Sequence, residues 1–293
     1  MNWADRRIGA RRGSRAAASG AACWLRAPVT LQPSYNGGMS ELSNASSPTP
    51  DPVTVSTSMT DRKIIGLKRR LVREASTAVG MLEDSLAALW DLDVERARAV
   101  RIADDAVDAE EVEIEQQCHE LLALHKPFAR DFRILTFILK TNADLERVAD
   151  HASSISKITI RLAEYVRPSH RLEWPTALIE LGERVPAMCH ELLRAVLDEN
   201  VERARELVAS DKVIDQLERR LFEENIERLL VTPREANDLA TGMLLARLGR
   251  ELERVGDLMA NIAEDVVYVG TGEIVRHAKR RGVVRGTKPP SKD

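Results

Sequence analysis

Long amphipathic segments separated by short breaks run from about residue 61 to residue 269. Within each segment, apolar residues recur at steps of three, four, seven or eight, which places them on one face of an α-helix. Proline, glycine and short polar stretches interrupt the pattern, because proline cannot continue a helix and restricts the residue before it. The pattern predicts six helices, at residues 61–90, 94–125, 128–166, 175–197, 201–230 and 233–269.

The apolar stripes of the first three segments predict which helix faces enter the core. Aromatic residues make up only 4% of the chain, whereas 44% is hydrophobic and 30% is charged, a composition typical of helices built from Ala, Leu, Val, Glu and Arg. We therefore expect an all-α fold. The first stripe comprises Ile64, Leu67, Leu71, Val79, Leu82, Leu86 and Leu89, the second Val100, Val107, Ile114 and Leu121, and the third Phe132, Leu135, Leu139, Leu145, Val148, Ile155, Ile158 and Leu162.

Two short strings occur twice at the same separation, which indicates an internal duplication. Leu-Glu-Arg-Val begins at Leu145 and again at Leu252, and Val-Glu-Arg-Ala-Arg begins at Val94 and again at Val201, so both pairs are 107 residues apart. Short connections within each set of three helices favour antiparallel neighbours. The sequence therefore predicts two tandem three-helix bundles, at residues 59–168 and 169–272.

The two ends of the chain lack this periodicity. Residues 1–58 are rich in Arg, Ser, Pro, Asn and Gly, and such a composition cannot offset the entropy cost of ordering. We predict a disordered extension there, or a mis-started sequence whose true beginning is Met39 or Met59. A targeting signal in residues 7–23 is the less favoured alternative, because polar residues interrupt its apolar part. Residues 273–293 form a basic tail that we expect to be solvated or to touch an acidic partner or anionic lipid.

Charge and cysteine content argue against several classes of function. The formal net charge is −3 and no zinc knuckle is present, so we do not expect a nucleic-acid partner. The three cysteines, Cys23, Cys118 and Cys189, are too widely spaced for a disulfide framework or a structural zinc site, which favours a reducing, cytoplasmic location. No apolar run approaches the roughly 20 residues of a membrane helix, so membrane contact is expected only through partners.

Carboxylates four residues apart occur on the second and third helices of each half. This step places both acids on one helix face, and antiparallel neighbours can bring two such pairs together. Four acids within reach repel one another unless a cation neutralises them, and an all-oxygen set suits a hard divalent or trivalent ion such as Mg²⁺, Mn²⁺, Ca²⁺ or iron. Glu111 and Glu218, on the same faces, are candidates for supporting groups. The predicted metal ligands are Asp104, Asp108, Glu146 and Asp150 in the first bundle, and Asp211, Asp215, Glu253 and Asp257 in the second.

Two other interpretations of these acids stay open. Acids four residues apart are common on solvated helices, and Arg101, Arg147 and Arg254 stand nearby, so some carboxylates could form only surface ion pairs. A carboxylate-bridged metal enzyme is disfavoured, because none of the six histidines has a glutamate three residues before it, as a di-iron site requires. No phosphate-binding glycine loop or nucleophile elbow is present either, so we do not expect an enzyme.

The sequence around the repeated string resembles the PhoU family, whose members regulate the phosphate-specific transport system. The resemblance covers about residues 60–277. It is carried by Asp-Leu-Glu-Arg-Val-Ala-Asp-His-Ala at 144–152, by Glu-Leu-Glu-Arg-Val-Gly-Asp at 251–257, by the strings at 261–268 and 271–277, and by the loop at 122–133.

This resemblance implies two three-helix bundles related by a pseudo-twofold axis, often in a homodimer, with a Glu/Asp-x-x-x-Asp/Glu metal motif on two helices of each bundle. The motif falls on the eight acids given above. Asn142 and Ala149 stand where the second copy has Gly249 and Gly256, so the two clusters need not select the same ion.

The functional expectation that follows is a cytoplasmic negative regulator of phosphate uptake and of phosphate-starvation signalling. The resemblance implies that such a protein is an adaptor between the ATPase of a phosphate ABC transporter and a sensor histidine kinase. The alternative is a helical accessory protein of another phosphate or ion transporter.

Overall fold

Six α-helices account for nearly all of the chain that the computed structural model describes, namely residues 59–166, 172–231 and 236–275. No strand occurs within those three ranges, so the predicted all-α class is confirmed. The predictions for residues 1–58 and for most of the basic tail lie outside the described residues. The helices are α1 (Met59–Asp91), α2 (Val94–His125), α3 (Ala129–Tyr165), α4 (Thr176–Leu197), α5 (Val201–Val231) and α6 (Ala236–Thr271).

The same tight turn joins the first two helices of each bundle. Leu92 has a φ of 50° and is followed by Asp93, whose side chain accepts a 3.0 Å hydrogen bond from the backbone N–H of Arg96. At an offset of 107 residues, Glu199 has a φ of 48° and Asn200 accepts the equivalent 3.0 Å bond from the N–H of Arg203. A capping side chain of this kind satisfies a free N–H at the start of a helix. The duplication therefore extends to backbone conformation.

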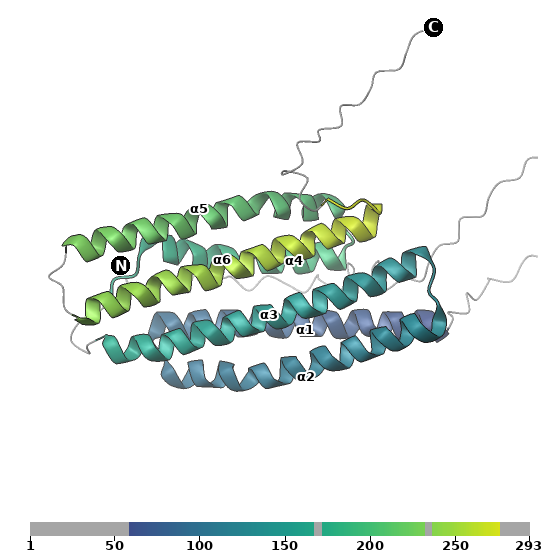
Figure 1. Cartoon of the computed structure of the whole chain (residues 1–293), viewed down its shortest axis with the longest axis horizontal. Helices are drawn as coiled ribbons and strands as arrows, with labels where there is room; N and C mark the ends of the chain where they lie inside the picture. The colour runs from purple at the N-terminus through teal and green to yellow at the C-terminus, as the bar shows by residue number, and fades with distance from the viewer. Residues whose placement is uncertain (1–58, 167–171, 232–235, 276–293) are drawn as a thin grey trace, which may run out of the picture.

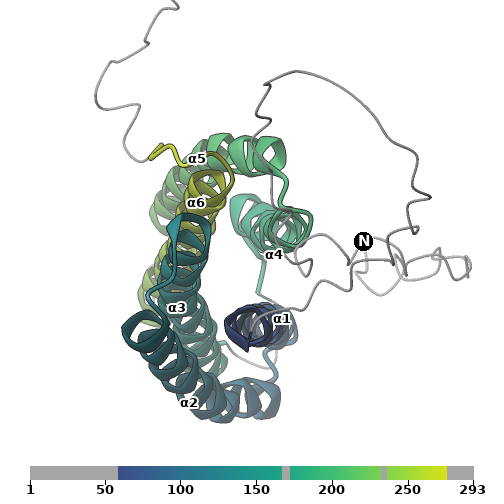
Figure 2. The same ribbon diagram turned by 90° about the vertical axis from the view of Figure 1, so that its right-hand side faces the viewer.

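The two bundles lie side by side rather than end to end (Figure 1). Viewed along the helices, α2, α3, α6 and α5 form one curved row, and α1 and α4 pack against its inner side (Figure 2). Helices α3 and α6 are antiparallel at the seam between the bundles, because Lys140 pairs with Asp265 and His151 with Glu251. This arrangement confirms the predicted tandem bundles, whereas the independence of residues 59–168 and 169–272 as domains stays a prediction.

The predicted apolar stripes of α1 and α2 are buried throughout, and burial of such side chains stabilises the bundle by about 1.5–3 kcal/mol each. One residue of the α3 stripe was assigned wrongly. Phe132 is 50% exposed, because the buried face of the first turns of α3 is set by Ile134, Leu135, Phe137 and Ile138. Residue 132 lies outside that face.

A close contact between α1 and α4 adds to the seam. The rings of Trp90 and Trp174 meet edge to face, with centroids 5.1 Å apart and planes at 87°. Gly182 of α4 makes room for Trp90, since a Cβ atom at Gly182 would lie 2.5 Å from the Cζ2 atom of that ring. The side chain missing at position 182 therefore sets how closely the two helices approach.

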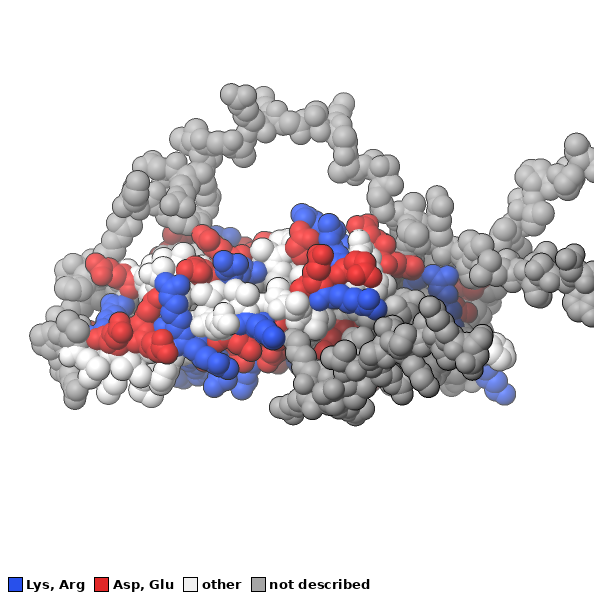
Figure 3. Space-filling model, turned by 90° about the horizontal axis from the view of Figure 1, so that it is seen from above, with Lys and Arg blue, Asp and Glu red and all other residues white. Residues whose placement is uncertain are grey.

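Charged side chains of both signs lie on the surface, and the two cysteines of the described ranges are buried. Acidic and basic side chains are intermixed on the face shown in Figure 3, as expected for ion pairs such as that of Arg220 with Glu224. Cys118 and Cys189 are buried and unbonded, and burial raises the pKa of each thiol to about 12. None of the described helices is long and apolar enough to cross a membrane.

Candidate metal centre

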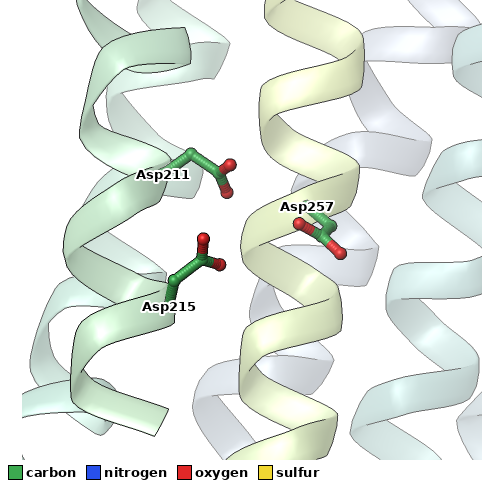
Figure 4. A group of neighbouring side chains, drawn as sticks. All are labelled: Asp211, Asp215 and Asp257. Atoms are coloured by element: carbon green, nitrogen blue, oxygen red, sulfur yellow. The ribbon is translucent and has the colours of Figure 1, made fainter. Parts of the chain in front are cut away.

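Three of the predicted ligands converge in the second bundle. Asp211 and Asp215 stand one turn apart on α5, and Asp257 stands opposite them on α6 (Figure 4). One carboxylate oxygen from each lies within 4.8 Å of the other two. Three acidic oxygens at this spacing are an arrangement that a hard cation could bridge.

Two glycines on α6 allow the close approach of α5. A Cβ atom at Gly256 would lie 3.0 Å from Cγ2 of Ile214, and a Cβ atom at Gly249 would lie 2.5 Å from Cδ2 of Leu221. Ile214 is itself buried between Asp211 and Asp215, so its packing fixes the face on which both acids emerge. The glycines therefore position the cluster although they carry no ligand atoms.

The carboxylates of this cluster repel one another, which favours neutralisation of their negative charge. Burial raises the pKa of Asp257, and the neighbouring Asp215 raises it further, against the opposing effect of Arg250. Burial also raises the pKa of Glu253, with Asp257 as the next cause, although Arg250 approaches it at 3.8 Å. A bound cation or a proton would relieve the same repulsion. Glu253 is thus in the electrostatic neighbourhood of the cluster without belonging to the group of three.

The four acids of the first bundle are less tightly gathered. Among the residues that the structure describes, no other three His, Cys, Asp or Glu side chains reach the 4.8 Å spacing. Burial raises the pKa of Glu146, and Asp150, Glu111 and Asp108 add to the rise. The four acids therefore share one electrostatic neighbourhood without converging on one point.

Asp104 is half-buried, as is Glu146, whereas Asp108 and Asp150 are exposed. Burial raises the pKa of Asp104, a hydrogen bond from Ser153 opposes the rise, and Asp150 adds to it. Its Oδ1 atom is buried and has no hydrogen-bond partner within the described part of the chain. An oxygen of this kind is a suitable ligand atom because it has already lost its water.

The difference between the bundles has a visible steric cause. Where α6 has Gly249 and Gly256, α3 has Asn142 and Ala149, and both of these side chains are buried. Asn142 donates a 2.9 Å hydrogen bond from Nδ2 to the backbone oxygen of Glu111, so a side chain stands between α2 and α3 at this level. The extra atoms at these two positions account for the looser arrangement of the first set.

The structure also brings in residues that sequence reasoning missed. Glu74 of α1 is buried in the first bundle and lies in electrostatic reach of Glu111 and Glu146. The signal in the sequence was the gap in the α1 stripe between Leu71 and Val79, where an acid occupies an inward position. His151 and Glu251, which pair across the seam, carried no signal of mutual contact.

Comparison with known proteins finds the same family domain in each of the two bundles. A family model described as the PhoU domain matches residues 71–159 and again residues 178–266. A phosphate-specific transport system accessory protein PhoU homolog from Deinococcus radiodurans is 35% identical over 173 residues, which cover 59% of this chain and 78% of the homolog. A protein of the same description from Pseudomonas aeruginosa is 33% identical over 199 residues, covering 67% of this chain and 78% of that protein.

Two crystal structures resemble the described fold at 27% sequence identity. The phosphate transport system regulatory protein PhoU from Streptococcus pneumoniae superposes with a TM-score of 0.66 and covers 74% of this chain and 99% of that one. PhoU from Pseudomonas aeruginosa superposes with a TM-score of 0.67 and covers 73% and 100% respectively. The likeness extends over both bundles, since nearly the whole of each known structure is matched.

Proposed function

The chain belongs to the PhoU family, and on this premise we propose that it is an accessory protein of a phosphate-specific transport system. The observation that carries the proposal is the double match of the family domain, one copy on each three-helix bundle. The names of the relatives support the choice of transport system. The finer role we propose is negative regulation of phosphate uptake and of phosphate-starvation signalling.

Metal binding is the proposed chemistry of the acid clusters. Asp211, Asp215 and Asp257 would hold the ion in the second bundle, with Glu253 as an additional ligand after a change of rotamer. A hard cation such as Mg²⁺, Mn²⁺, Ca²⁺ or iron supplies positive charge to an all-oxygen site. The convergence of three carboxylate oxygens and the raised pKa of Asp257 support this assignment.

The first bundle would bind its ion through four carboxylates that lie farther apart than the three of the second bundle. Asp104, Asp108, Glu146 and Asp150 share one electrostatic neighbourhood, and the pKa values of Asp104 and Glu146 are raised. Ions at the two clusters would tie α2 to α3 and α5 to α6, because each set of ligands spans two helices. Stiffer helix pairs would present a more rigid surface to a partner.

The proposed mode of action is that of an adaptor. We infer that a homodimer of this chain acts in the cytoplasm, where it contacts the ATPase of a phosphate ABC transporter and a sensor histidine kinase. When phosphate is plentiful, this contact would restrain the transporter and hold the kinase in a non-signalling state. The role needs complementary surfaces rather than catalytic residues.

The experiment that tests this function is deletion of the gene, followed by measurement of a phosphate-starvation reporter in phosphate-rich medium. We expect derepression in the deletion strain and restored repression when the wild-type chain is supplied. A chain carrying Asp215→Asn and Asp257→Asn should restore repression only in part, whereas the exposed control Glu206→Gln on α5 should restore it fully. An unchanged reporter in the deletion strain would rule out the regulatory role.

A pull-down separates the proposed partners from those of another transporter. The full chain, tagged at either end, should recover a phosphate ABC ATPase and a histidine kinase from phosphate-replete cells. Recovery of a different ion transporter, with no phosphate ABC component, would replace this function by the alternative accessory role.

A further inference from the structure

Glu74 is an acid in the interior of the first bundle. Its side chain lies on α1 between Leu71 and Ala78, and the residue is only 3% exposed. Neither carboxylate oxygen finds a hydrogen-bond partner among the described residues. Buried carboxylates are normally paired, hydrogen-bonded or bound to a cation. The absence of a hydrogen-bond partner at both oxygens of Glu74 therefore requires an explanation.

Arg70 lowers the pKa of Glu74 through its charge but does not serve as that partner. Arg70, one turn earlier on α1, donates from Nε and a terminal nitrogen to the two carboxylate oxygens of Glu110, at 2.7 and 2.8 Å. This bidentate ion pair directs the guanidinium of Arg70 toward Glu110. Arg70 also approaches Glu113 of α2 at 3.6 Å. The positive charge on this side of α1 is therefore drawn toward α2 and away from Glu74.

The helices packed against Glu74 add negative charge. Burial raises the pKa of Glu74 to about 8, and Glu110 and Glu111 of α2 raise it, as does Glu146 of α3, while Arg70 lowers it only in part. Burial likewise raises the pKa of Glu111. Four glutamates from three helices thus share one neighbourhood, and Arg70 only partly offsets their effect on the pKa of Glu74.

Asn142 supplies a second unsatisfied oxygen at the same level. Its Nδ2 atom donates to the backbone oxygen of Glu111, which places the side chain beside that residue. Its Oδ1 atom is buried and has no hydrogen-bond partner in the described ranges, and the residue is 1% exposed. A neutral amide oxygen is a common ligand of hard cations.

Both unsatisfied groups are peculiar to the first half of the duplication. At an offset of 107 residues, Glu74 corresponds to Leu181 and Asn142 to Gly249. Glu111 and Glu146, by contrast, have the acidic counterparts Glu218 and Glu253. The two exceptional residues occur together and on facing helices, so they act as one feature rather than two.

We propose that Glu74, Glu111 and Glu146, with the amide oxygen of Asn142, bind a hard divalent cation inside the first bundle. The site shares Glu146 with the motif acids of the first bundle, and through that residue it rests on the proposed metal-binding role. It differs from the motif set in having a ligand on α1, Glu74, that is almost fully buried. Because glutamate has three rotatable bonds, Glu111 and Glu146 can turn toward Glu74 when the ion enters. The ion would fasten α1 to the α2–α3 pair.

The experiment counts Mn²⁺ bound to the full-length chain after chelator treatment, from the electron paramagnetic resonance signal of the free ion. The informative variant is Glu74→Leu, which installs the residue of the second bundle and leaves all eight motif acids in place. We expect it to lose one Mn²⁺ per chain, or about tenfold in the affinity of one site. The thermal stabilisation that Mn²⁺ gives to the wild type should shrink in parallel.

Two further variants control for poor folding and for metal bound in the second bundle. Glu74→Gln preserves the shape of the side chain and should show the same loss if Glu74→Leu folds poorly. Asp215→Asn combined with Asp257→Asn should remove the ion of the second bundle and leave the Glu74 site filled. Equal Mn²⁺ counts and affinities in the wild type and both Glu74 variants would overturn the proposal. That outcome leaves the metal role of the second bundle to be judged from the aspartate variant alone.

Discussion

His151 of α3 and Glu251 of α6 meet across the seam between the two bundles, with Nδ1 of the imidazole 2.7 Å from a carboxylate oxygen. Both side chains are largely buried, at 16% and 10% exposure. The pair does not recur about the pseudo-twofold axis, since the counterparts of His151 and Glu251 are Leu258 and Asp144. Asp144 pairs instead with Arg147 on its own helix.

The first prediction concerns this seam. The single variants His151→Leu and Glu251→Gln and their combination should show a coupling energy of about 1 kcal/mol or more at neutral pH, because the contact is shielded from water. Urea denaturation of the four proteins gives the coupling. The exposed pair Glu95 and Arg98, 2.8 Å apart within α2, serves as the control and should couple by less than about 0.5 kcal/mol. Equal coupling in both cycles would contradict the prediction.

The same contact should weaken in acid. Burial raises the pKa of Glu251, but the hydrogen bond and charge of His151, together with Arg247, outweigh it, so the pKa lies below its usual value. A carboxyl group with a lowered folded-state pKa stabilises the fold above its unfolded-state pKa and loses that effect as the pH falls through the folded-state value. The coupling measured at pH 7 should therefore persist to about pH 4.5 and decline below it.

Glu74 should give the metal-free protein the opposite pH dependence. Its pKa rises from 4.5 to about 8 on folding, so the folded state holds a proton that the unfolded state has released between these values. The free energy of unfolding must then fall as the pH rises through that window. In chelator, Glu74→Leu should flatten the decline between pH 5 and pH 8, as followed by urea denaturation. A wild type and variant with parallel profiles would show that Glu74 does not titrate in this range.

A larger residue at position 182 should destabilise the fold. An added Cβ atom would meet the ring of Trp90 at 2.5 Å, and that ring is held against Trp174, so Gly182→Ala should destabilise the fold by about 1–3 kcal/mol. Gly80 of α1 is the matched control, because nothing lies within 4 Å of its added Cβ atom. Gly80→Ala should stabilise the protein by about 0.4–1 kcal/mol. Thermal unfolding followed by tryptophan fluorescence compares the two.

Asp257→Asn should raise the melting temperature of the metal-free protein and reduce the stabilisation that Mn²⁺ provides. In chelator the variant should melt at a higher temperature than the wild type, because it removes a charge from a cluster whose pKa values are raised. With Mn²⁺ present, its gain in melting temperature should be smaller than that of the wild type, since one ligand has lost its charge. Glu206→Gln should match the wild type in both conditions. A variant that gains as much from Mn²⁺ as the wild type would remove Asp257 from the site.

The sequence predicted the helices well because their signal is local. A period of 3.6 residues and a proline or glycine at each break can be recognised without knowledge of the fold, and the 107-residue repeat then implies two bundles. The inward faces of α1 and α2 followed from the same period. Phe132 was the exception, because an apolar residue in the first turn of a helix has no guarantee of a neighbour to pack against.

The candidate metal site was also only partly predictable from the sequence. The spacing of Asp211 and Asp215, and of Glu253 and Asp257, fixes which helix face each acid occupies, and this could be predicted from the sequence. The separation between the helices could not, because it depends on Gly249 and Gly256 in one bundle and on Asn142 and Ala149 in the other. Whether the acids converge therefore depends on the distance between α5 and α6 in one bundle and between α2 and α3 in the other.

The sequence by itself determined six helices, a duplication and the faces that carry the acids, because these depend on residues within a few turns of one another. Only the tertiary structure decided that Asp211, Asp215 and Asp257 converge, that Glu74 is buried beside Glu111, and that His151 meets Glu251. Those contacts join residues from different helices. Their distances follow from packing between helices, which the periodicity of a single helix does not encode.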